Sequence, residues 1–151
     1  MLLVRTDIAN APPLAGRPLP GFDGIKIDLT ADQTKDKMIL VCFFDMNQRP
    51  SRHCLTQLST RAQELKAKDF FIIAIQAAKV SADELNTWVK ESGISFPVGT
   101  IEGDVNETRF NWSVRSLPWL ILTDTEHIVR ADGFGINELN EKIRSMANVK
   151  R

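Results

Sequence analysis

The chain has 151 residues, of which 43% are hydrophobic and 25% are charged, a balance typical of one globular domain and unlike a disordered chain. Its 19 Lys and Arg residues balance its 19 Asp and Glu residues, so the formal net charge is zero. This balance argues against a nucleic-acid partner, because nucleic-acid binding needs a basic surface. The two cysteines are too few for a disulfide framework, and their spacing to the two histidines matches no zinc finger. We predict no metal site and no cofactor.

Prolines and glycines are concentrated before residue 25, where they predict an extended arm over residues 1–24, followed by one domain over residues 25–151. The longest nearly uncharged stretches, 38–44 and 70–78, fall short of the roughly 20 residues that span a membrane. We therefore predict no membrane insertion, and charges within the first seven residues argue against a signal peptide. The arm resembles a linker, so we expect a module of a longer protein, whose compartment the sequence does not identify.

The first half of the domain is predicted to alternate strands with a helix. Residues 25–29 alternate apolar and polar side chains, as a half-buried strand does, and residues 30–37 form a polar loop. The apolar runs 38–44 and 70–75 predict central strands that are covered on both faces. Between them, residues 51–68 have an apolar stripe at helical spacing. The stripe consists of Cys54, Leu55, Leu58, Ala62 and Leu65.

The second half is predicted to contain two helices, with a strand between them as an open alternative, followed by a hairpin and a final helix. A capping box at residues 81–84 opens the first helix, which Gly93 can end. The later elements are predicted as a short helix over 104–112, strands over 119–122 and 127–131, and a helix over 137–146. Strands that alternate with helices predict a three-layer α/β/α sandwich around a mixed sheet.

Three segments, taken together in their order and spacing, resemble one protein family. They are the arm and entry strand at 14–29, the strand that runs into a helix at 40–54, and a Leu-Pro step before an apolar strand at 114–122. The chain resembles a thioredoxin-like domain of the TlpA/ResA or redoxin (AhpC/TSA) type over residues 14–146. The resemblance implies a thioredoxin-like α/β fold and oxidoreductase relatives that serve cell redox homeostasis, often outside the cytoplasm.

The resemblance places the family's Cys-x-x-Cys motif on Gln48, Arg49, Pro50 and Ser51, where the proline is kept and both cysteines are absent. Disulfide exchange requires a thiolate at the start of the helix and a second thiol that resolves the mixed disulfide. An amide and a hydroxyl do not supply that chemistry. We therefore predict a degenerate active site that does not carry out dithiol–disulfide exchange, and we assign no catalytic residue there.

The Leu117–Pro118 step is the second feature that the resemblance singles out. In thioredoxin-like folds the matching proline is cis and faces the active-site helix, and the residue before it pairs with a substrate peptide through its backbone. The leading hypothesis is a binding or scaffold module whose groove lies between residues 48–51 and 117–118. The predicted binding residues are Arg49, Leu117 and Pro118, and the predicted partner is a peptide or protein segment.

Cys54 carries the alternative hypothesis, a one-cysteine thiol peroxidase or thiol-disulfide oxidoreductase. The peroxiredoxin pattern Pro-x-x-x-Thr-x-x-Cys is only partly met, since Ser51 replaces the threonine and Pro50 lies at the wrong spacing. Cys54 also belongs to the apolar stripe and Cys42 lies in the middle of a strand, which favours two buried structural cysteines. Because the strand is expected to pack on the helix, a disulfide between Cys42 and Cys54 remains an alternative.

Four basic residues are candidates for an anion site at the start of the helix over 51–68: Arg49, Arg52, His53 and Arg115. Ordinary solvated charge is the favoured interpretation, because nothing in the sequence shows that they converge. The remaining candidates have structural interpretations: His127 on a hairpin strand, Trp112 and Trp119 in packing, and Asp83, Glu84, Asp104 and Glu107 at helix starts.

Overall fold

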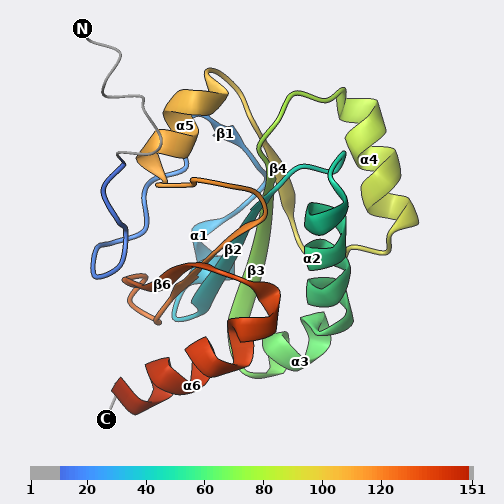
Figure 1. The fold of residues 1–151 in the computed structure, drawn as a ribbon. Helices are drawn as coiled ribbons and strands as arrows, with labels where there is room; N and C mark the ends of the chain where they lie inside the picture. Colours follow the sequence, from blue (N-terminus) through green and yellow to red (C-terminus); the bar gives the residue numbers. More distant parts are fainter. Residues whose placement is uncertain (1–10, 150–151) are drawn as a thin grey trace, which may run out of the picture.

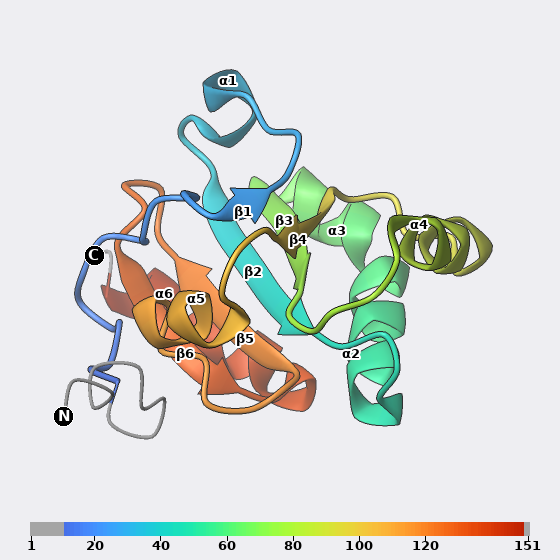
Figure 2. The ribbon, with the colours of Figure 1, turned by 90° about the horizontal axis from the view of Figure 1, so that it is seen from above.

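The computed structural model describes residues 11–149, so the first ten residues of the predicted arm and the last two of the chain lie outside the described residues. A six-stranded mixed sheet, in the order β1-β4-β3-β2-β5-β6, forms the middle layer. The strands β4, β3 and β2 run parallel to one another, and β1, β5 and β6 are antiparallel to their neighbours. Helices and the arm lie on the two faces (Figures 1 and 2), which confirms the predicted α/β sandwich.

The elements follow the predicted order closely. They are β1 (Ile25–Lys26), α1 (Ala31–Thr34), β2 (Met38–Phe44), α2 (Arg49–Thr60), α3 (Ala62–Ala67), β3 (Phe70–Gln76), α4 (Ala82–Glu91), β4 (Val98–Ile101), α5 (Val105–Asn111), β5 (Trp119–Thr123), β6 (Val129–Phe134), the 3-10 helix η3 (Ile136–Glu138) and α6 (Leu139–Val149). No helix among them has both the length and the apolar character to cross a membrane.

Several predicted bounds are wrong. The entry strand has two residues, and the predicted loop after it contains the one-turn helix α1. The helix predicted over 51–68 begins two residues earlier and is divided at Arg61, which ends α2 and precedes α3. The strand predicted from His127 begins at Val129, because His127 has a φ of 66° and belongs to the turn.

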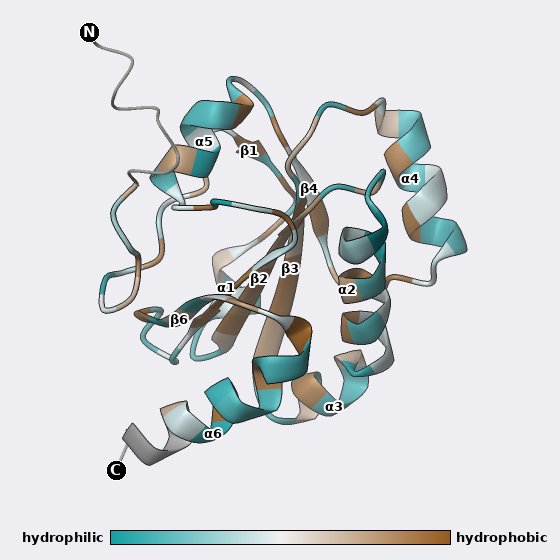
Figure 3. Cartoon of the chain, viewed as in Figure 1, coloured by the Kyte–Doolittle hydropathy of each residue, from teal (hydrophilic) through white to brown (hydrophobic). Residues whose placement is uncertain are grey.

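The central strand β2 separates two hydrophobic clusters. Leu40, Cys42 and Phe44 point to one face, where the helices α2, α3, α4 and α6 cover the sheet. Ile39, Val41 and Phe43 point to the other face. There the cover consists of the arm, through Leu14, and the segment around α5, through Trp112 and Val114, and Ile25 of β1 belongs to the same cluster. The apolar character of β2 and β3 along their whole length is visible in Figure 3 and follows from burial on both faces.

The described part of the arm packs against the sheet. The Gly16 N–H donates to the Val129 carbonyl at 2.7 Å, and the Val129 N–H donates to the Arg17 carbonyl at 2.8 Å. Pro18 forms an isolated antiparallel bridge with Ile128. The arm therefore pairs with the start of β6, and the buried Leu14 side chain anchors it in the second cluster.

Gly133 in β6 allows Trp119, the first residue of β5, to lie against the neighbouring strand. Its φ of 77° lies in the left-handed region, and a Cβ atom added there would lie 2.7 Å from the Trp119 ring. Gly16 has a similar φ of 89° but no atom within 4 Å of such a Cβ. The close approach of the indole ring is therefore specific to Gly133, and it positions the start of β5 next to Pro118.

We expect Gly133→Ala to destabilise the fold more than Gly16→Ala. Both variants force alanine into the left-handed region, at a cost of about 1–2 kcal/mol, and only Gly133→Ala also displaces the Trp119 ring, which adds about 1 kcal/mol or more. Urea unfolding followed by circular dichroism measures both free energies of unfolding. Equal losses in the two variants would contradict the proposed contact between Gly133 and Trp119.

Candidate functional site

The segment that carries the family motif lies at the start of α2. Gln48 is the N-cap residue, and Arg49 and Pro50 are exposed in the first turn. Ser51 is completely buried, and its hydroxyl accepts a hydrogen bond from the Asp45 N–H at 3.0 Å. Its side chain therefore fixes the loop before the helix.

Gln76, at the end of β3, is hydrogen-bonded to the loop between β2 and α2. Its Oε1 atom accepts a hydrogen bond from the Met46 N–H at 2.9 Å. Its Nε2 atom donates to Asp45 Oδ1 at 3.2 Å and to the Ala78 carbonyl at 3.1 Å. Sequence reasoning missed this residue, although a glutamine at the end of an otherwise apolar strand is a signal for a buried polar contact.

A cavity of about 240 Å³ lies beside the start of α2. It is lined by Pro50, His53 and Cys54 of α2, by Pro118 and Leu120, and by Phe134, Gly135, Ile136 and Asn137. Most of these side chains are apolar, and the imidazole and the amide supply polar groups. The cavity brings together three of the predicted site residues: Pro50, Cys54 and Pro118.

Pro118, which follows Leu117, lines the cavity opposite α2, whereas the Leu117 side chain packs against the hydrophobic cluster on the other face of the sheet. The peptide bond between them is cis, and both residues are half-buried. Within residues 11–149, no hydrogen bond involves the backbone N–H or C=O of Leu117, since the pairing of β5 with β2 begins at Trp119.

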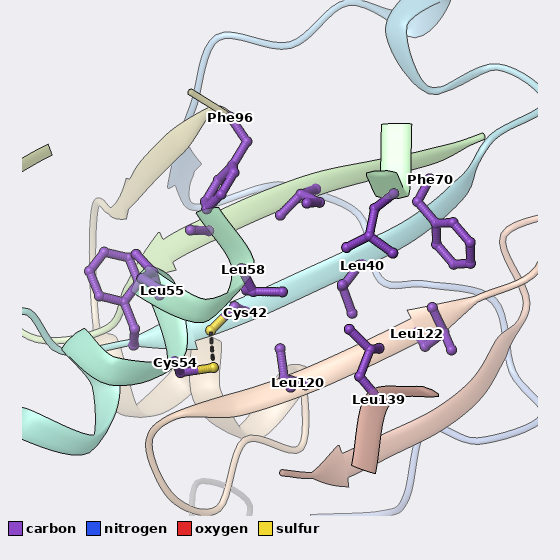
Figure 4. Close-up of a cluster of buried hydrophobic side chains, with 14 of the residues drawn as sticks. Leu40, Cys42, Cys54, Leu55, Leu58, Phe70, Phe96, Leu120, Leu122 and Leu139 are labelled. Atoms are coloured by element: carbon purple, nitrogen blue, oxygen red, sulfur yellow. Dashed lines mark hydrogen bonds between the residues drawn. The ribbon is translucent and has the colours of Figure 1, made fainter. Parts of the chain in front are cut away.

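Cys54 lines this cavity, and the Cys42 side chain of β2 points toward it, as Figure 4 shows. Cys54 is 2% exposed and Cys42 is 0% exposed, as the apolar patterns predict. Their sulfur atoms are 3.8 Å apart, and both thiols are free. The contact with Cys54 and the burial of the side chain both raise the pKa of the Cys42 thiol well above its usual value. Cys42 is therefore a neutral thiol at neutral pH.

The four basic residues near α2 do not form an anion site together. Arg52 donates from Nη1 to the Met46 carbonyl at 3.1 Å, and Arg115 donates from Nη2 to the Ala11 carbonyl at 2.9 Å. Arg115 is thus directed to the arm, and Arg52 supports the loop before α2. His53 lines the cavity, and Arg49 remains exposed beside it.

The other polar candidates have structural roles. His127 Nε2 lies 2.9 Å from the Thr34 carbonyl and joins the β5–β6 turn to α1. Trp112 is buried between the rings of Phe22 and Phe43, at centroid distances of 5.3 and 5.2 Å. Asp83, Glu84, Asp104 and Glu107 are at helix starts, where Asp104 accepts hydrogen bonds from the backbone of Asn106 and Glu107. In the described part of the chain, no three His, Cys, Asp or Glu residues are grouped closely enough to hold a metal ion.

Solved structures with the same arrangement of strands and helices include redox proteins of two kinds. The thioredoxin domain of a thiol-disulfide oxidoreductase from Bacteroides vulgatus has a TM-score of 0.73 and 16% sequence identity, over 89% of this chain and 99% of that chain. A thiol-disulfide isomerase from Corynebacterium glutamicum has a TM-score of 0.63 and 20% identity, over 84% and 88% of the two chains. The chain has a thioredoxin-like fold.

A reduced 2-Cys peroxiredoxin from Plasmodium vivax is also similar, with a TM-score of 0.70 and 14% identity over 91% of this chain and 99% of that chain. No family model and no curated protein matches the sequence. At these identities the likeness establishes the fold and leaves the reaction to be argued from the site itself.

We expect Gln76→Leu to destabilise the protein by about 2–4 kcal/mol, because it leaves the Met46 N–H and the Ala78 carbonyl without their buried partner. The amide of Met46 should also exchange its hydrogen faster. The matched control is Gln57→Leu on the exposed face of α2, which we expect to stay within about 0.5 kcal/mol of the wild type. Urea unfolding and hydrogen exchange measure both effects, and a Gln76→Leu variant as stable as the control would contradict this role.

Proposed function

We propose that this chain is a thioredoxin-fold binding module, of the TlpA/ResA or redoxin type, that holds an extended peptide segment and does not carry out dithiol–disulfide exchange. The observation that carries the proposal is the composition of the α2 start, where the N-cap residue is Gln48 and Ser51 is a buried structural hydroxyl. Neither side chain can attack a disulfide.

The positions of the two thiols support the first part of the proposal. Disulfide exchange begins with a thiolate that a partner's disulfide can reach. Cys42 is fully buried and protonated, and Cys54 is 2% exposed. A protein disulfide does not fit to either sulfur without opening the core.

The cavity beside Pro118 supports the second part. Its volume of about 240 Å³ lies below the range of roughly 300–1,000 Å³ that is typical for small-molecule sites, which favours a single apolar side chain over a whole ligand. In the part of the chain that the structure describes, the backbone N–H and C=O of Leu117 have no hydrogen-bond partner, and Leu117 directly precedes Pro118 of the cavity wall, so an extended peptide can pair with them. Arg49 is exposed next to Pro50 and offers a positive charge to a carboxylate of the same peptide.

Cys54 lines the same cavity, and this observation favours the alternative, a one-cysteine thiol peroxidase. Its small exposure weighs against rapid turnover, because a reactive thiol has to be accessible and partly ionised. The presence of Cys42 at 3.8 Å also means that Cys54 is not a solitary thiol. We therefore keep the binding module as the proposed function.

An array of extended ten-residue peptides, each with one central leucine or phenylalanine, tests the binding function. We expect Ile136→Asp to lower the affinity for the tightest-binding peptide about tenfold or more, which corresponds to about 1.4 kcal/mol, because it places a charge in the cavity. The matched control is Val80→Asp, another half-buried residue on the same core cluster but outside the cavity. Binding by no peptide, or equal weakening in both variants, would contradict the proposal.

Reduction of insulin in the presence of dithiothreitol tests the absence of dithiol chemistry. We expect the wild type to reduce insulin no faster than dithiothreitol alone, because no thiol is exposed at the start of α2. The double variant Gln48→Cys and Ser51→Cys, once shown to fold by circular dichroism, should gain measurable activity. Catalysis by the wild type at a rate close to that of a thioredoxin would refute this part of the proposal.

A further inference from the structure

The proposed binding function does not require the contact between Cys42 and Cys54. We infer that the two cysteines form a redox pair beneath the cavity, which a small peroxide oxidises to an intramolecular disulfide between β2 and α2. Their sulfur atoms are 3.8 Å apart in the reduced protein, and no other cysteine is present in the chain. Figure 4 shows the two thiols directed at one another across the interface of strand and helix.

The cavity provides the route for the oxidant, and it determines which sulfur reacts first. Cys54 lines the cavity, whereas Cys42 lies behind it in the core with no exposed surface. Hydrogen peroxide is close to water in size and fits easily into about 240 Å³. A bulky aromatic thiol reagent does not reach a sulfur that is 2% exposed. The peroxide therefore meets Cys54 first.

The reaction balances with peroxide as the only oxidant. The Cys54 sulfur attacks one oxygen of hydrogen peroxide, the O–O bond breaks, and the products are a sulfenic acid on Cys54 and one water. The Cys42 sulfur then attacks the Cys54 sulfur, and the hydroxyl of the sulfenic acid leaves with the Cys42 thiol proton as a second water. Two thiols are oxidised to one disulfide, and one peroxide is reduced to two waters.

We expect α2, and not β2, to move when the disulfide forms. A disulfide has an S–S distance of about 2.05 Å, so the sulfurs have to approach by about 2 Å. Cys42 is held by β-ladder pairing to Ala74 on one side and Leu120 on the other. Cys54 is in the second turn of α2, whose first two residues, Arg49 and Pro50, are exposed. The strand is the fixed partner, and the helix is the one that shifts.

Disulfide formation would also change the cavity. Cys54 forms part of its wall, and the new bond draws this sulfur toward β2. We expect oxidation to weaken peptide binding several-fold, and this consequence, unlike the disulfide itself, rests on the proposed binding function.

Peroxide titration of the folded wild-type protein, followed by intact mass and peptide mapping, tests the pair. We expect the loss of two hydrogen atoms and a cross-linked peptide that contains Cys42 and Cys54, reversed by dithiothreitol. The bulky reagent dithionitrobenzoate should modify neither thiol unless the protein is denatured. A product that carries only added oxygen atoms, or an unchanged mass, would overturn the proposal.

Two serine variants test the order of the steps. Cys42→Ser should stop at a sulfenic acid on Cys54 that dimedone traps, and Cys54→Ser should leave Cys42 oxidised about tenfold more slowly or not at all. Faster oxidation of Cys42 in the second variant would refute the route through the cavity. Should a serine variant fail to fold, dimedone labelling of the wild type during the titration identifies the first sulfur to react.

The peptide array on reduced and oxidised wild type separates this inference from the proposed function. A disulfide that forms without any peptide binding in either state contradicts the proposed function alone. Peptide binding with no disulfide under peroxide contradicts only the redox pair.

Discussion

The packing of β2 between its two neighbours determines where every part of the site lies. The strand is hydrogen-bonded to β3 on one side and β5 on the other, and its side chains are buried on both faces. The loop before α2 follows the end of β2. The even-numbered residues of the strand, Cys42 among them, point toward that helix. The pairing of β2 with β5 begins one residue after Pro118. A shift of one residue would exchange the faces of these side chains.

The loop that follows this apolar strand is stabilised by polar contacts. Gln76 and Ser51 together satisfy backbone and side-chain groups of the loop between β2 and α2, and Arg52 accounts for the carbonyl of Met46. A helix start that needed a reactive thiol would keep its first turn open to a partner. Here Arg49 and Pro50 of the first turn are exposed, whereas Ser51 is buried and its hydroxyl serves the loop.

Local patterns in the sequence predict the elements that depend on local chemistry. The apolar run of β2, the Ser81 and Asp104 caps and the stripe that buries Cys54 are all found as expected. Several element bounds, such as the division of the predicted helix at Arg61, are nevertheless wrong, and contacts between distant segments are not predicted at all. Nothing near Arg115 in the sequence indicates that its guanidinium binds the Ala11 carbonyl. The 3.8 Å contact between the two sulfurs likewise depends on how a helix packs on a strand, which sequence spacing does not determine.

The pairing of the arm with β6 has a consequence for the chain in solution. An edge strand with free N–H and C=O groups is a template for pairing with other chains, and proteins cover or shorten such edges. Gly16 and Arg17 occupy the outward N–H and C=O groups of Val129, and Pro18, which has no N–H to offer, lies opposite Ile128. At the opposite edge, β1 has two residues. The arm thus occupies the start of one edge of the sheet, and the shortness of β1 leaves little open strand at the other.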